Sequence, residues 1–199
     1  MARNAHRRTA IAFVALAFCA ALSSGCGDPT LAESALRPRP PRLISISGEA
    51  ASLSNPGFEE WSASGPSGWL TQGEPRPTLT PARADARQGK VALEAGPGHA
   101  PFFLAQEVRF RNGLAGAVVR VEAQARTAVP EGVACSIWAG RGRHASGAPH
   151  PGDGAWRPVA CAYRFPENWP HTECLIRFDF AQGSGAVLLD DVALEVERP

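Results

Sequence analysis

The sequence has little net charge: its 199 residues carry 20 basic and 19 acidic side chains, a formal charge of +1 at neutral pH. Nucleic-acid-binding proteins gather basic residues on one face or in one stretch, and the sequence has no such run. Uninterrupted helical stretches are lacking as well, because 20 glycines and 18 prolines are spread along the chain and both weaken a helix interior. These absences exclude a nucleic-acid partner and a helical bundle, and they favour an all-β fold.

Recognisable catalytic patterns are also missing. His99, His144, His150 and His171 stand alone between predicted strands, no serine lies in a nucleophile-elbow motif, and the cysteine and histidine spacings match no zinc motif. The sequence shows no pair of acidic residues that would face a glycosidase cleft. We therefore expect no enzymatic activity.

Residues 1–25 have the pattern of an export signal. Three arginines precede an apolar run over residues 10–22, which is long enough for the core of a signal peptide and too short to span a bilayer. The run leads into Leu22-Ser23-Ser24-Gly25-Cys26, which resembles the lipobox of bacterial lipoproteins, although Leu22 lies four residues before the cysteine instead of three. The resemblance implies lipidation of Cys26 and anchoring to a membrane of the bacterial cell envelope, in the periplasm or at the cell surface. The alternative is ordinary cleavage near Gly25, which would leave Cys26 as a free or paired thiol.

Residues 26–44 form a predicted tether. They are polar and include Pro38, Pro40 and Pro41 among arginines, a composition typical of an extended and semi-rigid spacer without a core. A proline-rich ligand for another domain is the alternative interpretation. Residues 45–199 are then long enough for one domain with a sizeable core.

The body of the chain shows the two-residue period of β-strands. Apolar side chains occupy alternate positions in 119–125, with polar residues between them, so one face of each strand is expected to be buried and the other wet. The same alternation occurs in several further stretches separated by glycine- and proline-rich turns: 133–137, 159–165 and 174–180, to which 90–95, 102–110 and 187–196 are added. Seven or eight such strands predict a two-sheet antiparallel β-sandwich.

Several short motifs occur in a recognisable order within this body. They are Asn-Pro-Gly-Phe-Glu at 55–59, Gly-Trp at 68–69, Gly89, Gln-Glu-Val at 106–108, Trp156, and Val-Leu-Leu-Asp-Asp-Val-Ala-Leu at 187–194. Together they resemble a galactose-binding-like jelly roll, of the carbohydrate-binding-module type found beside xylanases and cellulases. The resemblance covers about residues 50–197 and implies non-catalytic binding of a polysaccharide or glycan. A protein-interaction or structural envelope module with the same sandwich and no sugar site is the alternative.

The resemblance also implies a structural calcium ion. In that family the first and last motifs meet and often hold the cation, which places Glu59, Asp190 and Asp191 as candidate ligands. A hard cation needs several oxygen ligands, and two chain segments that supply carboxylates and carbonyls can provide them. In the alternative, Asp190 and Asp191 accept hydrogen bonds from backbone amides and Glu59 is a solvated turn residue.

Five tryptophans are the candidate sugar-stacking side chains, because a sugar ring presents flat C–H faces to an aromatic plane. We interpret Trp69 and Trp156 as core or edge packing. Strand alternation places Trp138 on the solvent side, where it is either a binding platform or packed under the 140–154 loop. Trp61 and Trp169 lie in predicted loops, where they either line a binding site or hold those loops in place by packing.

Jelly-roll strand order predicts which polar side chains share the sheet face of Trp138. They are Arg157, Arg164, Glu107 and Arg109. Gln106 has inward parity, so it is expected to satisfy buried backbone groups. A second set of outward residues is assigned to the other sheet as ordinary solvated positions: Arg120, Glu122, Gln124 and Asp179.

The body contains three cysteines, which allow at most one intramolecular disulfide. Cys135 and Cys161 are symmetric about Ala148, so a hairpin in that register would set them opposite each other on one face. This predicts a Cys135–Cys161 disulfide and a buried Cys174 thiol. A Cys161–Cys174 disulfide across the 166–170 connection is the competing arrangement.

Overall fold

We analysed a computed structural model, which describes residues 52–96, 100–140 and 142–199. The predicted signal peptide, the tether and Cys26 lie outside these residues. No helix in the described part of the chain is long and apolar enough to cross a membrane.

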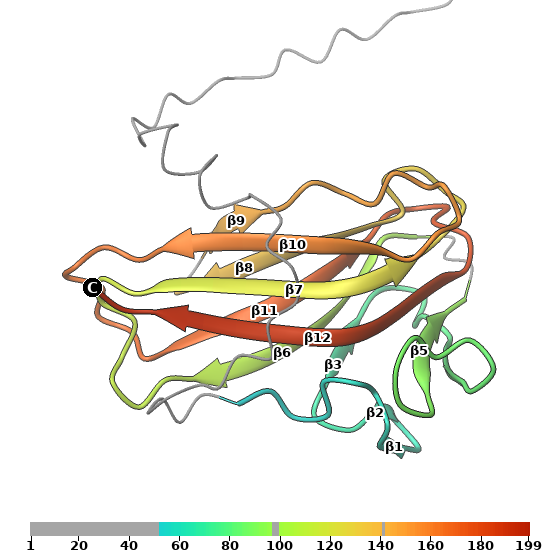
Figure 1. Cartoon of the computed structure of the whole chain (residues 1–199), viewed down its shortest axis with the longest axis horizontal. Coiled ribbons are helices and arrows are strands. Elements are labelled where there is room, and N and C mark those ends of the chain that lie inside the picture. The colour runs from blue at the N-terminus through green and yellow to red at the C-terminus, as the bar shows by residue number, and fades with distance from the viewer. Residues whose placement is uncertain (1–51, 97–99, 141) are drawn as a thin grey trace, which may run out of the picture.

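The described residues form two antiparallel five-stranded sheets and one short hairpin (Figure 1). The sheet that we call the β7 sheet has the strand order β10 (Arg157–Arg164), β7 (Val118–Arg126), β12 (Val187–Glu197), β5 (Ala92–Ala95) and β4 (Leu79–Ala82). The β11 sheet has the order β3 (Leu70–Gln72), β6 (Phe102–Arg109), β11 (Glu173–Phe180), β8 (Val133–Ala139) and β9 (Gly142–Ser146). The hairpin pairs β1 (Trp61–Ser62) with β2 (Gly65–Pro66). The predicted two-sheet sandwich is confirmed.

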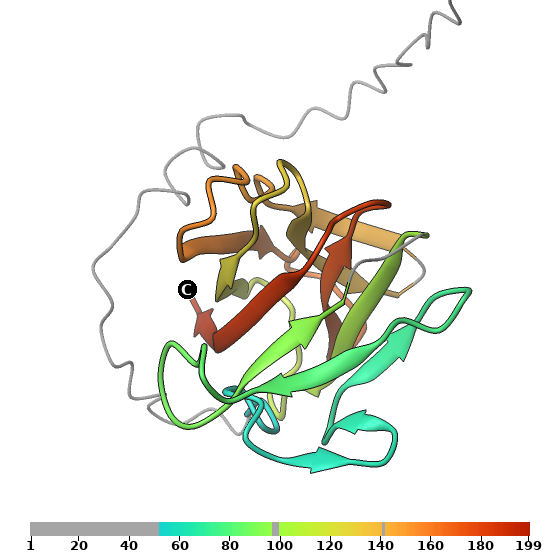
Figure 2. The same cartoon turned by 90° about the vertical axis from the view of Figure 1, so that its right-hand side faces the viewer.

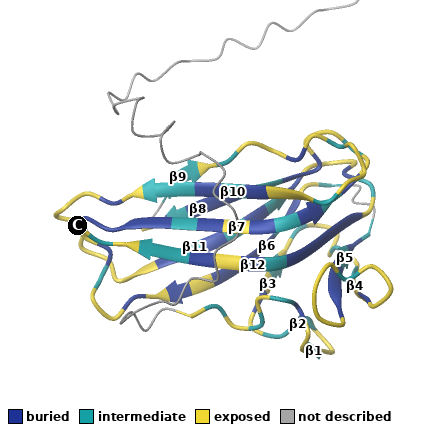
Figure 3. Ribbon diagram, viewed as in Figure 1, coloured by how far each residue is buried: buried dark blue, intermediate teal, exposed yellow. Residues whose placement is uncertain are grey.

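The two sheets stack face to face, as the view along the strands shows (Figure 2). In β7 the odd-numbered residues Val119, Val121, Ala123 and Ala125 are buried, whereas the even-numbered positions between them are half-buried or exposed. Figure 3 shows the same alternation of buried and accessible positions along the neighbouring strands. Burial of one face of each strand is therefore the sequence feature that brings the two sheets together.

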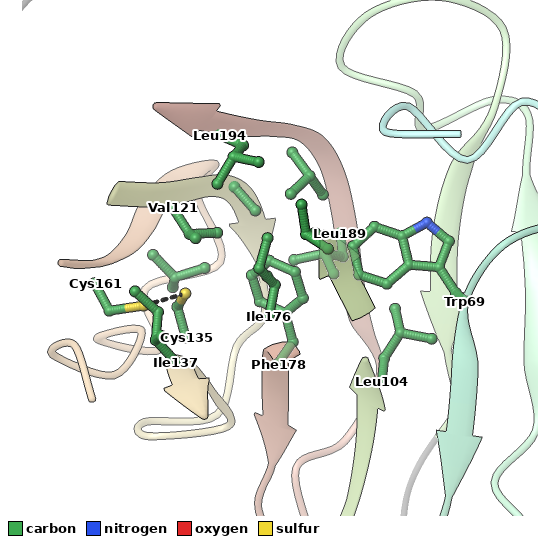
Figure 4. Packing of buried hydrophobic residues seen from close by; sticks show 14 of the residues in the cluster. Trp69, Leu104, Val121, Cys135, Ile137, Cys161, Ile176, Phe178, Leu189 and Leu194 are labelled. Carbon is green, nitrogen blue, oxygen red and sulfur yellow. Dashed lines mark hydrogen bonds between the residues drawn. The ribbon is translucent and has the colours of Figure 1, made fainter. Parts of the chain in front are cut away.

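The core lies between the sheets and is rich in aromatic rings. Trp69 contacts Phe58 and Phe178, with ring centroids 5.3 and 6.0 Å away, and its Nε1 donates to the Asn55 carbonyl over 3.2 Å. Figure 4 shows the indole beside Leu104 and Leu189, which come from opposite sheets. The prediction that Trp69 packs in the core is confirmed.

The hairpin expected between the strands of Cys135 and Cys161 is not formed. β8 pairs with β9 and β11 in one sheet, whereas β10 pairs with β7 in the other. The reason is the 142–150 segment, which returns along β8 and takes the pairing position that the symmetric hairpin would have given to β10. Cys135 and Cys161 therefore face each other across the core instead of along one sheet.

Candidate functional site

The outer face of the β11 sheet carries the candidate site. Trp138 on β8 lies opposite Leu175 on β11, and Leu175 lies opposite Glu107 on β6. Trp138 is half-buried and Glu107 is exposed, while their neighbours in sequence face the core. The predicted outward orientation of Trp138 is confirmed, and Glu107 shares its face.

An arginine lies between two aromatic rings on this face. The Arg177 guanidinium is 3.9 Å from the ring centroid of Phe103 and 4.6 Å from that of Trp138. These three side chains come from the adjacent strands β11, β6 and β8. The charge of Arg177 is attracted to both ring faces, so the three groups form a stack that spans the middle of the sheet. We call it the Phe103–Arg177–Trp138 stack.

A chain of hydrogen bonds connects Trp138 to Arg177 through Ser136 and Asp179. Trp138 Nε1 donates to Ser136 Oγ over 3.0 Å, and Ser136 Oγ donates to Asp179 Oδ2 over 2.5 Å. The other carboxylate oxygen of Asp179 accepts a short charge-assisted hydrogen bond from Arg177. Each member of the stack that carries a polar group is thus fixed in orientation, which lowers the entropy lost when a ligand binds.

An open pocket of about 770 Å³ adjoins the stack at one end of the sheet. Trp138 and Leu175 form its apolar floor, and Glu107, Glu173 and His171 line it with polar groups. Arg109 lies 3.0 Å from Glu107 and 3.8 Å from Glu173, so it joins the two acids along one edge. The pocket therefore combines an aromatic surface with hydrogen-bonding groups.

Two of the expected neighbours of Trp138 are on the wrong sheet. Arg157 and Arg164 belong to β10, which is an edge strand of the β7 sheet. Arg157 forms an ion pair with Asp153, and Arg164 lies 3.5 Å from the Gly116 carbonyl oxygen. Their assignment to the face of Trp138 is therefore wrong, because the sequence does not specify that β10 crosses to the opposite sheet.

The sequence-based prediction that Asp179 lies on the other sheet is also wrong. β11 lies between β6 and β8, which brings Asp179 next to Ser136 and Arg177. Alternation in the sequence already gives Arg177 and Asp179 outward parity. Phe103, Ser136 and Arg177 were missed because parity alone does not say which strands are neighbours.

Trp169 lies behind one wall of the pocket. Its ring packs against Phe165 and His144, with centroids 5.3 and 5.0 Å away, and against His171 at 5.4 Å. A Cβ added at Gly140, which lines the pocket, would lie 3.9 Å from the Trp169 ring. Trp169 thus supports the pocket wall through His171 and does not line the pocket itself.

The two remaining tryptophans lie apart from the stack. Trp61 lines a separate pocket of about 460 Å³ beside the β1–β2 hairpin, and its Nε1 donates to the Phe58 carbonyl over 2.6 Å. Trp156 packs on a small cluster that includes Ala92 and Leu188 of the β7 sheet, as the edge-packing interpretation predicts.

Gln106 fills the structural role that its parity predicts. Its Oε1 accepts a hydrogen bond from the Ser54 amide over 2.8 Å, and its Nε2 donates to the carbonyls of Ser54 and Gly68. The buried side chain therefore satisfies backbone groups of the N-terminal segment and is not available to a ligand.

The candidate calcium ligands meet at the expected junction of the first and last motifs. The Val192 amide donates to the Pro56 carbonyl over 3.0 Å, and a Cβ added at Gly57 would lie 3.9 Å from Asp190 Oδ1 and from Glu59 Cγ, so both side chains flank Gly57. Glu59 Oε1 accepts the amides of Lys90 and Val91, and Asp191 pairs with Arg87 at 2.7 Å. No group of three or more acidic, histidine or cysteine side chains forms a metal site in the described part of the chain.

Asp190 is the buried member of this set. Its Oδ2 accepts the amides of Arg87 and Gln88, and its Oδ1 accepts the Asp191 amide. Burial raises the pKa of the Asp190 carboxyl, and these amide hydrogen bonds oppose the rise. Asp190 therefore accepts hydrogen bonds from backbone amides, as the alternative interpretation expects. We propose that a calcium ion can also bind at this junction through Glu59 and Asp190.

Replacing Asp190 with alanine should lower the free energy of unfolding by about 1 to 3 kcal/mol, because three backbone amides lose their acceptor. Asp153→Ala is the matched control, since Asp153 is exposed and its surface ion pair contributes little.

Millimolar calcium should raise the melting temperature of the wild type and leave that of Asp190→Ala unchanged. A wild-type melting temperature that changes neither with added calcium nor with a chelator would contradict the calcium proposal.

No family model and no curated protein matches the chain. Several solved structures resemble it in three dimensions. A cyclase from Fischerella sp. TAU aligns with a TM-score of 0.56 and 14% identity over 75% of this chain and 98% of that one. The CBM22-1 xylan-binding domain of Paenibacillus barcinonensis Xyn10C aligns with a TM-score of 0.54 and 15% identity, covering 72% and 92% of the two chains.

TmCBM61, solved with β-1,4-galactotriose, aligns with a TM-score of 0.51 and 24% identity over 73% of this chain and 97% of that one. The fold is thus shared by binding modules and by a cyclase, so it does not by itself distinguish binding from catalysis. At these identities the likeness establishes the fold alone: the chain has the jelly-roll β-sandwich fold that the CBM22-1 domain, TmCBM61 and the cyclase share.

Proposed function

We propose that this protein binds carbohydrate without catalysis, through the outer face of the β11 sheet. The observation that carries the proposal is the Phe103–Arg177–Trp138 stack beside an open pocket lined by acids. Sugar rings stack their C–H faces on aromatic planes, and carboxylates and guanidinium groups bond to their hydroxyls. The two neighbours described as binding xylan and galactotriose support this assignment.

Two acids of this face already have hydrogen-bond partners, which supports a role in binding. Asp179 is shared between Ser136 and Arg177, and Glu107 is paired with Arg109. A general acid or base must be free to exchange a proton with the substrate, whereas both of these carboxylates already accept hydrogen bonds from protein groups. Such carboxylates are suited to accept hydrogen bonds from sugar hydroxyls.

Retention on immobilised polysaccharides tests this function. The full chain is passed over xylan, β-1,4-galactan, cellulose and peptidoglycan, and the fraction retained is compared with that of a serum-albumin control. We expect selective retention by at least one polymer. Failure to bind these polymers, and failure to bind an array of host glycans, would contradict the proposal and favour the protein-interaction alternative.

Export and membrane anchoring through Cys26 form the second part of the proposal, supported by the lipobox-like sequence at 22–26. We expect the wild type to fractionate with membranes and to need detergent for release, because acyl chains contribute about 0.8 kcal/mol per buried methylene. Cys26→Ala should appear in the soluble fraction or as the unprocessed precursor. Equal processing and equal detergent dependence of the two proteins would contradict lipidation.

A further inference from the structure

The three cysteines of the body lie in the core between the two sheets. Cys135 on β8 is fully buried, and Cys161 on β10 and Cys174 on β11 are each 2% exposed. Cys135 Sγ and Cys161 Sγ are 2.7 Å apart and point toward each other from opposite sheets (Figure 4). Both are free thiols in the structure, and their separation is shorter than the usual contact distance of non-bonded carbon atoms, about 3.5 to 4 Å.

We propose that Cys135 and Cys161 form a buried disulfide that joins the two sheets, and that Cys174 stays a thiol. The oxidant is a disulfide of a thiol–disulfide oxidoreductase or oxidised glutathione. One cysteine thiolate attacks this disulfide and forms a mixed disulfide, with release of one thiol. The second thiolate then displaces the other, so the protein loses two electrons and two protons and the donor ends as two thiols.

Cys174 is placed to compete for Cys161 but not for Cys135. Phe178 is the residue of β11 opposite Cys135, and Cys174 lies four positions further along that strand, roughly 13 Å away at about 3.3 Å per residue. Burial raises the pKa of Cys174 to about 12, with a further contribution from Cys161. The short sulfur–sulfur approach therefore favours the Cys135–Cys161 bond over the alternative.

The bond has to form while the chain folds, before the core closes. In the folded protein both thiols are shielded from a bulky oxidant, and burial raises the pKa of the Cys135 thiol, which lowers its thiolate fraction. The same burial shields the finished bond from reductants. The disulfide would fix β8, which carries Ser136 and Trp138, to the opposite sheet.

Peptide mapping tests the connectivity, because trypsin places the three cysteines in separate peptides: 127–141, 144–164 and 165–177. The full-length chain is folded in a glutathione redox buffer with mild detergent, its free thiols are alkylated in denaturant, and it is digested. We expect 127–141 linked to 144–164, and 165–177 alkylated. A link between 144–164 and 165–177, or three alkylated peptides from folded protein, would overturn the proposal.

Reduction gives a second readout. Dithiothreitol should leave the cross-link intact in native buffer and remove it in guanidinium chloride. Protein that is reduced in denaturant and refolded with the reductant present should melt roughly 10 °C below the oxidised protein, since a bond between residues 26 apart restricts the unfolded chain. Cys174→Ala should keep the cross-link and this difference, whereas Cys161→Ala should lose both. Rapid reduction in native buffer would contradict the buried position of the bond.

Discussion

Trp138→Ala should weaken binding to a retained polysaccharide by roughly 5- to 150-fold, or about 1 to 3 kcal/mol. The substitution removes the aromatic floor of the pocket and one of the two rings that hold Arg177. It also frees Ser136, which accepts the indole N–H. Titration calorimetry with the polymer that retains the wild type measures the loss.

Trp156→Ala is the matched control for this experiment. Trp156 also packs beside an arginine, with the Arg126 guanidinium 5.6 Å from its ring, but it contacts the β7 sheet on the opposite side of the domain. The Trp156→Ala protein should bind the polymer with the affinity of the wild type. Unchanged affinity in Trp138→Ala, with the fold intact by circular dichroism, would show that the stack is not the sugar platform.

Gly147→Ala should lower the free energy of unfolding by about 2 to 4 kcal/mol. A Cβ at this position would lie 1.7 Å from the Ala160 carbonyl oxygen and 2.7 Å from its carbon. Gly147 also donates its amide to the Cys135 carbonyl over 2.9 Å, so the segment cannot move away without losing this bond. Overpacking against backbone is among the costly substitutions because neither side can rotate out of the way.

Gly142→Ala separates this effect from a general cost of replacing glycine. Gly142 is the first residue of β9, the strand that ends immediately before Gly147, and a Cβ there would meet no heavy atom within 4 Å. Its stability should stay within about 0.5 kcal/mol of the wild type. Denaturant unfolding of the three proteins makes the comparison, and equal midpoints would refute the close approach of Gly147 to β10.

Alternation along a strand predicts the sheet face on which a side chain lies. It placed Trp138 and Glu107 outward and Gln106 inward, and the structure agrees in each case. A period of two residues reports the face of a strand and carries no information on its neighbours. This is why Arg157 and Asp179 were exchanged between sheets.

The cysteine pair shows the same limit. The sequence symmetry about Ala148 selects Cys135 and Cys161, which the structure brings together, but the hairpin that the symmetry implies does not exist. Every second residue of β8 and of β10 points into the same core. Inward residues of the two strands can therefore meet across the sandwich as well as along a sheet. Inward parity is therefore the correct part of that prediction, and the register is the incorrect part.

The most direct test of the proposed binding face uses the five tryptophan indole N–H signals in a nitrogen–proton correlation spectrum. Each signal is assigned by single Trp→Phe substitution, and the protein is titrated with an oligosaccharide of the retained polymer. A sugar platform on the β11 sheet predicts the largest shift or broadening at Trp138, with Trp156 and Trp69 unchanged. A spectrum in which Trp61 or Trp156 responds to the sugar while Trp138 does not would contradict it.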